Sequence, residues 1–115
     1  MFSLTHFIVL LFCTLGSVVL AFDGDLTYYQ PGLGSCGETS SDSDRVVALA
    51  PGQFESTPDA CGKMIQITKG DLNATAKVVD KCPVCTLGSI DVSSTVFQEI
   101  APLSAGRVQI TWEYM

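Results

Sequence analysis

The sequence VVDKCPVCTLGSIDV, residues 78–92, places two apolar segments, a cysteine pair and two carboxylates within fifteen residues. The first segment continues from Lys77, is predicted to be a buried strand, and is expected to stop at Asp80. The chain then crosses a Cys-Pro-Val-Cys turn and becomes a second apolar segment that carries Asp91. Functional side chains are concentrated on loops that a rigid scaffold positions, so we expect the protein to act beside this stretch.

The segments on either side of this stretch indicate a mainly β domain. Alternation of apolar and polar residues, or short apolar runs, predict strands at 25–29, 46–49, 64–68, 74–79, 90–92 and 107–114. Short helical pieces are expected after Ala50 and after Ser93, which can cap a helix that Pro102 ends. A hairpin turn is expected at 69–73.

Two blocks of sequence recur with a constant offset of 43 residues. They are Ile65–Thr68 with Val108–Thr111, and Val47–Leu49 followed by Phe54 with Ile90–Val92 followed by Phe97. Both copies have the order strand, short helix, turn, strand. Two copies are too few for a solenoid, but they suit a closed barrel with pseudo-two-fold symmetry, whose closure leaves no exposed sheet edge.

The first 21 residues are typical of a secretory signal peptide. They contain a long apolar run that ends in Val19-Leu20-Ala21, with small residues at the positions that a signal peptidase reads. A membrane anchor is the alternative, because a spanning helix needs about 20 apolar residues. Asp23 and Asp25 directly after Ala21 favour cleavage. We therefore expect a secreted monomer without a membrane anchor, in which residues 1–21 are the signal and residues 22–115 form one domain.

The mature domain would have four cysteines and no histidine. Removing 21 of the 115 residues leaves 94, enough for one small core, and it removes Cys13 and His6. An even cysteine number in a short secreted chain predicts two disulfides, although spacing alone leaves three connectivities open. The absence of histidine excludes Ser-His-Asp and Cys-His catalysis and the usual zinc sites, so we expect no metal and no cofactor. Redox Cys-X-X-Cys motifs lie at the N-terminus of a helix, whereas no helix is predicted next to Cys82-Pro83-Val84-Cys85. This difference favours a structural disulfide.

The net charge and a glycosylation sequon predict features of the protein surface. Twelve acidic and six basic residues give a net charge of −6, which repels phosphate backbones and argues against a nucleic-acid partner. Asn73-Ala74-Thr75 is an N-glycosylation sequon that we place on the hairpin turn, where a transferase could reach it.

The order and spacing of several motifs resemble the double-psi β-barrel superfamily. The motifs cover nearly the whole mature chain and are Gly24–Tyr29, Gly34–Gly37, Cys61–Lys63, Val78–Cys82, Ile90–Ser93 and Val108–Trp112. The resemblance is strongest to small secreted fungal proteins with a rare-lipoprotein-A-like domain. Barwin, the first domain of expansins and a family of endoglucanases resemble the sequence more distantly.

The resemblance implies a six-stranded barrel with two psi loops and a groove that holds polysaccharide or peptidoglycan. It implies that Asp91 matches the proton donor of the endoglucanases, which expansins also require, and that Asp80 matches an aspartate implicated in lytic transglycosylases. It also implies a Cys36–Cys61 disulfide, as in barwin and expansins, which leaves Cys82 to pair with Cys85.

Three departures from these relatives argue against an enzyme. The lytic transglycosylases carry a histidine where this chain has Gly34–Gly37. Expansins have His-Phe before their aspartate, and this chain has Ser89-Ile90. Expansins also carry a second, carbohydrate-binding domain, which we do not expect in a chain that stops at Met115.

Each candidate site residue has a structural alternative. Asp80 and Asp91 are the candidate catalytic pair, because glycoside cleavage normally needs two carboxylates. However, Asp80 could instead accept backbone hydrogen bonds in its own turn, and Asp91 could simply face solvent. Tyr28, Tyr29 and Trp112 could stack on sugar rings. One of the adjacent tyrosines is expected to pack inward, and Trp112 could lie in the core or at the rim.

These observations lead to three hypotheses. The first is a secreted barrel that binds cell-wall polysaccharide or a related oligosaccharide without cutting it, through Asp80, Asp91 and one of the tyrosines. The second is a protein-binding module, such as an inhibitor of cysteine proteases or an effector that binds a host protein. The third is a weak wall-lytic enzyme that uses Asp91.

Overall fold

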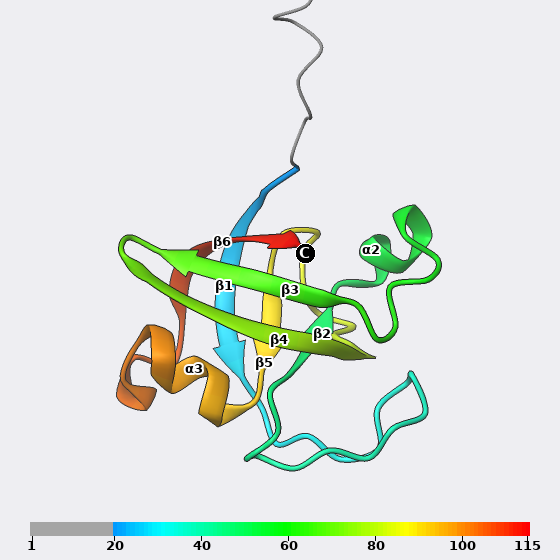
Figure 1. Cartoon of the computed structure of the whole chain (residues 1–115), viewed down its shortest axis with the longest axis horizontal. Helices are drawn as coiled ribbons and strands as arrows, with labels where there is room; N and C mark the ends of the chain where they lie inside the picture. Colours follow the sequence, from blue (N-terminus) through cyan, green and yellow to red (C-terminus); the bar gives the residue numbers. More distant parts are fainter. Residues whose placement is uncertain (1–19) are drawn as a thin grey trace, which may run out of the picture.

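Six strands close into a barrel in the computed structural model, which describes residues 20–115 (Figure 1). The strands are β1 (Phe22–Tyr28), β2 (Val46–Leu49), β3 (Met64–Lys69), β4 (Leu72–Lys81), β5 (Ile90–Val92) and β6 (Val108–Tyr114). Helix α2 (Pro51–Ser56) follows β2, and helix α3 (Ser94–Ile100) with the 3₁₀ turn η1 (Leu103–Ala105) follows β5. The order around the barrel is β1-β5-β2-β4-β3-β6, which confirms the predicted mainly β fold with short helices.

The strand register confirms the predicted two-fold repeat. Strand β2 runs antiparallel to β5, with Ala48 opposite Asp91, and β3 runs antiparallel to β6, with Thr68 opposite Thr111. In these two pairs the partners are 43 residues apart, so Ala48 and Thr68 each lie opposite their own counterpart in the other half of the barrel. The same symmetry relates the two parallel pairs: β5 with β1 in one half corresponds to β2 with β4 in the other. A pseudo-two-fold axis therefore passes through both antiparallel junctions.

The core fills the barrel and continues under α3. Alternate residues of each strand point inward, and Leu26, Ile67 and Ile90 are completely buried. Helix α3 packs against β4 and β1, and its buried residues Val96, Phe97 and Ile100 form the apolar face that the sequence predicts. Ser93 stands at the N-cap position, but its hydroxyl donates to the carbonyl of Asp44 (2.6 Å) and does not cap the helix.

Strand β4 is longer than predicted at both ends. It runs past Asp80 to Lys81 because β2 pairs with it in parallel there, after a bulge between Val47 and Ala48. At its start the turn shrinks to Gly70-Asp71, where Gly70 has φ +59°, a conformation that favours glycine. Asn73 consequently lies within the strand, opposite Thr68, and not on the turn. It is still solvent-exposed.

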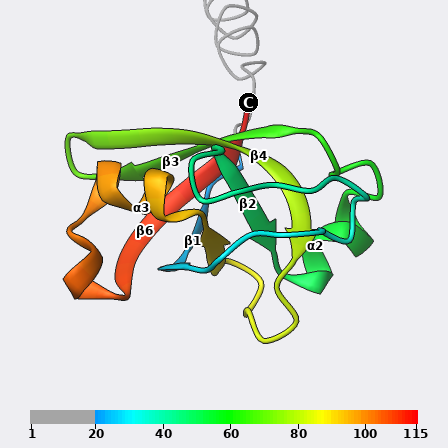
Figure 2. The same ribbon diagram turned by 90° about the horizontal axis from the view of Figure 1, so that it is seen from below.

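Two disulfides, Cys36–Cys61 and Cys82–Cys85, lie within the described residues 20–115, and they are the pairs that the resemblance implied. The second closes a short loop after β4, and this loop projects from the barrel as the yellow segment of Figure 2. Within residues 20–115, no helix has the length and apolar character needed to cross a membrane. The expected signal peptide lies almost entirely outside the described residues.

Candidate functional site

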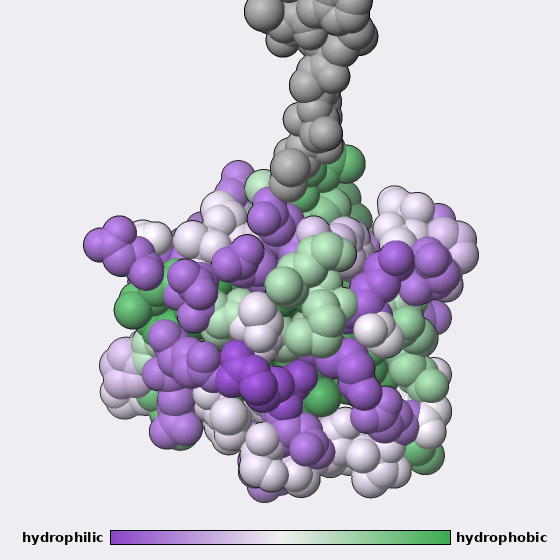
Figure 3. Space-filling model, viewed as in Figure 1, coloured by the Kyte–Doolittle hydropathy of each residue, from purple (hydrophilic) through white to green (hydrophobic). Residues whose placement is uncertain are grey.

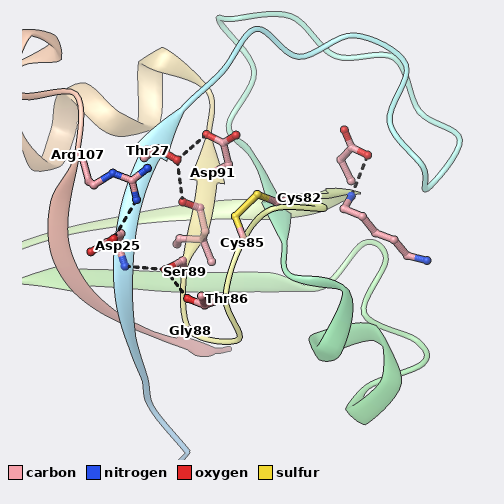
Figure 4. The surroundings of a disulfide bond; sticks show 12 residues. Asp25, Thr27, Cys82, Cys85, Thr86, Gly88, Ser89, Asp91 and Arg107 are labelled. Carbon is pink, nitrogen blue, oxygen red and sulfur yellow. Dashed lines mark hydrogen bonds and ion pairs between the residues drawn. A yellow bond between two sulfur atoms is a disulfide. The ribbon is translucent and has the colours of Figure 1, made fainter.

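A cleft of about 140 Å³, lined by both polar and apolar side chains, lies where β1, β5 and the loop after β4 meet (Figure 4). Asp25 and Thr27 of β1, Asp91 of β5, and Arg107 just before β6 line it. The Cys82–Cys85 loop and Ser89 form its other wall. The cleft therefore lies beside residues 78–92, and one of the two predicted carboxylates, Asp91, lines it.

Asp91 is held half-buried in this cleft. Its neighbours Ile90 and Val92 point into the core, so strand alternation turns Asp91 outward. The hydroxyl of Thr27, on the parallel neighbour β1, donates to Asp91 Oδ1 (3.0 Å). Burial raises the pKa of Asp91 above its ordinary value, whereas the Thr27 hydrogen bond and the charge of Arg107 oppose that shift. Asp91 thus combines partial burial with access to the cleft.

Asp25 and Arg107 form an ion pair at the cleft, which the sequence did not predict. Arg107 Nη1 donates to Asp25 Oδ2 (2.9 Å), and Gln109 Nε2 donates to Asp25 Oδ1 (2.5 Å). Both carboxylate oxygens are therefore engaged. Alternate polar positions on the last strand were the available signal, but only the pairing of Asp25 with Gln109 across β1 and β6 brings these residues together.

Asp80 shapes the neighbouring loop. Its Oδ1 accepts hydrogen bonds from the backbone N–H groups of Ser35 (2.9 Å) and Lys81 (2.8 Å). The loop approaches β4 closely at Gly34, where a Cβ would lie 2.2 Å from the carbonyl oxygen of Val79. These contacts agree with the structural alternative for Asp80. Its charge still reaches the cleft, because it contributes to the raised pKa of Asp91.

The adjacent tyrosines have different surroundings. Burial raises the pKa of Tyr29 to about 12, and the negative charges of Asp80 and Asp91 add to the effect. Tyr28 packs against Phe97, with ring centroids 4.8 Å apart, and its hydroxyl donates to the carbonyl of Leu103 (3.0 Å). The structure thus groups Tyr29 with Asp80 and Asp91. Tyr28 instead contacts α3 and the η1 turn, and its side chain remains exposed.

Trp112 is a core residue, which corrects its assignment to the ligand-binding set. Its side chain is 1% exposed and stacks on Phe22, with ring centroids 4.5 Å apart. Its indole N–H donates to the carbonyl of Gly88 (2.9 Å). The physical reason is the inward pleat of β6 at this position, which the alternating sequence could not distinguish from a position at the rim. Trp112 therefore has no face available to a ligand.

The raised pKa of Asp91 leads to a prediction about stability and pH. A carboxyl group whose pKa is higher in the folded than in the unfolded state opposes folding once it ionises. We expect Asp91→Asn to stabilise the protein at neutral pH, and the gain to disappear as the pH falls below about 4, the ordinary aspartate pKa. Urea unfolding from pH 3 to pH 7 measures this difference. A loss of stability at pH 7, relative to the exposed control Asp71→Asn, would contradict it.

The amino-acid sequence was compared with known proteins and the fold with solved structures. The papain inhibitor of Streptomyces mobaraensis is 32% identical over 100 residues, which cover 80% of this chain and 70% of the inhibitor. The solved structure of the Streptomyces papain inhibitor superposes with a TM-score of 0.73 at 29% identity, covering 84% of this chain and 94% of the inhibitor. The chain belongs to the double-psi β-barrel family of this inhibitor.

Two other proteins that resemble this chain, in sequence or in fold, are longer than it is. Allergen Asp f 7 of Aspergillus fumigatus is 38% identical over 109 residues, which cover 89% of this chain and 38% of the allergen. The chain thus spans little more than a third of that relative. The structure of apo Clavibacter michiganensis expansin, at 22% identity, has a TM-score of 0.73 and covers 84% of this chain and 50% of the expansin. A mutant expansin in complex with cellohexaose superposes equally well, at 23% identity. The expansins therefore show the fold alone. No family model matches the chain.

Proposed function

We propose that this protein is an extracellular binding module whose cleft beside Asp91 holds a segment of a cell-wall polysaccharide. The observation that carries the proposal is the half-buried Asp91, which lines the cleft beside Thr27 and Arg107 and lies close enough to Asp80 and Tyr29 for their charges to interact. The fold is shared with an expansin that is described in complex with cellohexaose, which supports a saccharide as the ligand.

The chemistry of the cleft suits sugar hydroxyl groups. The carboxylate of Asp91 accepts hydrogen bonds, and Thr27 engages its Oδ1, which fixes its orientation. Arg107 is half satisfied by Asp25 and has further N–H groups with which to donate to a sugar oxygen. Since Trp112 is buried, affinity would depend on these polar groups and on Tyr29 rather than on a broad aromatic surface.

The test uses the mature chain, residues 22–115, incubated with insoluble glucan, chitin and peptidoglycan. A hydrogen bond to a charged group contributes about 1.5–3 kcal/mol, so Asp91→Asn is expected to weaken retention by roughly 10-fold to 100-fold. Asp71→Asn removes the same charge from the exposed β3–β4 turn and is expected to bind like the wild type. Retention by none of the polymers contradicts the proposal. Release of reducing ends that Asp91→Asn abolishes would instead indicate the weak wall-lytic enzyme.

Inhibition of a papain-like cysteine protease is the second candidate function. The observation that favours it is the similarity to the papain inhibitor, which extends over 94% of the solved inhibitor chain. A fluorogenic papain assay with the mature chain tests this candidate. Inhibition without polysaccharide retention would establish the second function in place of the first.

We also propose that the chain is secreted and glycosylated at Asn73. Secretion would follow from the signal peptide predicted at residues 1–21, after which β1 begins directly at Phe22. The exposed side of β4 leaves Asn73 accessible to a glycosyltransferase. Expression in a fungal host, with mass measurement before and after enzymatic deglycosylation, tests both points. Asn73→Gln is expected to abolish the mass difference.

A further inference from the structure

The Cys82–Cys85 loop, whose Val84 also lines the cleft, carries an exposed apolar tip. The side chain of Val84 is 92% exposed, and Pro83 beside it is also exposed. Leu87, a few residues later, is 55% exposed and packs over Gly52 of α2. In Figure 2 the loop projects from the end of the barrel. Because they are exposed on a projecting loop, these apolar side chains are accessible to a partner.

Hydrogen bonds to β2 and α2 also hold the loop in place. The N–H of Cys82 donates to the carbonyl of Leu49 (2.8 Å), and the N–H of Cys85 donates back to Cys82 (3.1 Å). Gln53 Nε2 donates to the carbonyl of Leu87 (2.8 Å), although Gln53 itself is buried in α2. Preorganisation of this kind reduces the conformational entropy that a loop loses on binding.

The disulfide prevents the loop from adopting an extended conformation. Three residue steps of extended chain span about 10 Å, whereas the Cα atoms of Cys82 and Cys85 lie 5.4 Å apart. Proteases bind substrates as extended strands whose side chains fill successive pockets. This loop can therefore offer an apolar side chain to such a pocket, but its backbone cannot take the conformation required for cleavage.

We propose that the Cys82–Cys85 loop, with Val84 at its tip and Leu87 beside it, enters the substrate cleft of a papain-like cysteine protease and resists cleavage there. This inference rests on the second candidate function and identifies the surface that performs it. The partner has an apolar pocket that receives Val84. Val84 also lines the cleft, but the carboxylate of Asp91 is not required for this contact.

The experiment measures inhibition of papain by the mature chain and by matched variants. Val84→Asp and Leu87→Asp would each bring a charge into an apolar pocket, so we expect each to raise the inhibition constant at least 10-fold. Leu72→Asp makes the same change at a 50% exposed leucine in the β3–β4 hairpin, and is expected to inhibit like the wild type. Thermal melts confirm that each variant is folded.

The outcomes test separately whether the protein inhibits papain and whether this loop makes the contact. If the wild type does not inhibit papain, the second candidate function and this inference are both wrong. If the wild type inhibits and both loop variants match it, inhibition stands and the assignment to the loop is wrong. The double variant Cys82→Ser/Cys85→Ser opens the ring while the Cys36–Cys61 disulfide remains. We expect papain to cut it between residues 82 and 86, as mass spectrometry would show. An uncut, fully inhibitory double variant would overturn the proposal.

Discussion

Gly88→Ala is expected to unfold the barrel at temperatures at which the wild type is fully folded. A Cβ on Gly88 would lie 1.8 Å from the carbonyl oxygen of Asp23 and 2.8 Å from its carbonyl carbon. The opposing residue is also a glycine, because a Cβ on Gly24 would lie 2.3 Å from the backbone of Gly88. Two glycines therefore let the loop before β5 cross directly over β1.

The backbone cannot relieve this clash without a large cost in free energy. Asp23 is fixed in the ladder between β1 and β6, opposite Thr111, so its carbonyl cannot move without breaking strand pairing. Overpacking against movable side chains already costs about 1–3 kcal/mol, and we expect about 3 kcal/mol or more here. For a domain of this size the melting temperature would fall by roughly 10–20 °C.

Urea unfolding and thermal melts of Gly88→Ala measure the effect. Gly32→Ala is the matched control, because a Cβ there has no atom within 4 Å. Its stability is expected to stay within about 0.5 kcal/mol of the wild type. Equal unfolding midpoints for the two variants would show that the loop and β1 do not meet as the structure describes.

Trp112→Ala is expected to cost about 3–5 kcal/mol, the usual range for deleting a large buried aromatic side chain. The ring packs against both Phe22 and Tyr114, with centroid distances of 4.5 and 5.1 Å. Its removal also leaves the carbonyl of Gly88 without the indole donor (2.9 Å). Circular dichroism during urea unfolding measures the loss, since this variant has no tryptophan fluorescence.

Trp112→Phe separates the core role from the ligand-binding role that the sequence suggested. Phenylalanine keeps the stacking on Phe22 and loses only the hydrogen bond and part of the volume, so a smaller loss of stability is expected. Retention on polysaccharide is expected to be unchanged. A variant of wild-type stability that no longer binds polysaccharide would contradict the core assignment.

Local sequence patterns predicted the fold well, because the strands of a barrel alternate between inward apolar and outward polar residues. The alternation in residues 108–114 and the repeat between 65–68 and 108–111 are both local signals. The end of β4 was not predictable, since its pairing with β2 carries the strand past Asp80. Trp112 was ambiguous for the same reason: the period of two identifies a strand, but not how far along it the core extends.

The candidate site was predicted only in part. Asp80 and Asp91 come from one short stretch, and their proximity to each other and to Tyr29 emerged with the fold. The ion pair between Asp25 and Arg107 joins residues 82 positions apart, so only closure of the barrel brings it to the cleft. Gln53 was also missed, because nothing in its local sequence shows that a glutamine in a short helix is buried beneath the loop.

The two-fold axis between β2 and β5 has a consequence for binding stoichiometry. A duplicated barrel presents each strand position twice, and a ligand site built on such a position could therefore occur twice. The counterpart of Asp91 is Ala48, whose methyl group is buried and can accept no hydrogen bond. The two halves therefore share a backbone arrangement but differ in the side chains at this position. A saccharide that depends on the carboxylate should bind in the ratio of one site per chain, with no weaker twin on the opposite half.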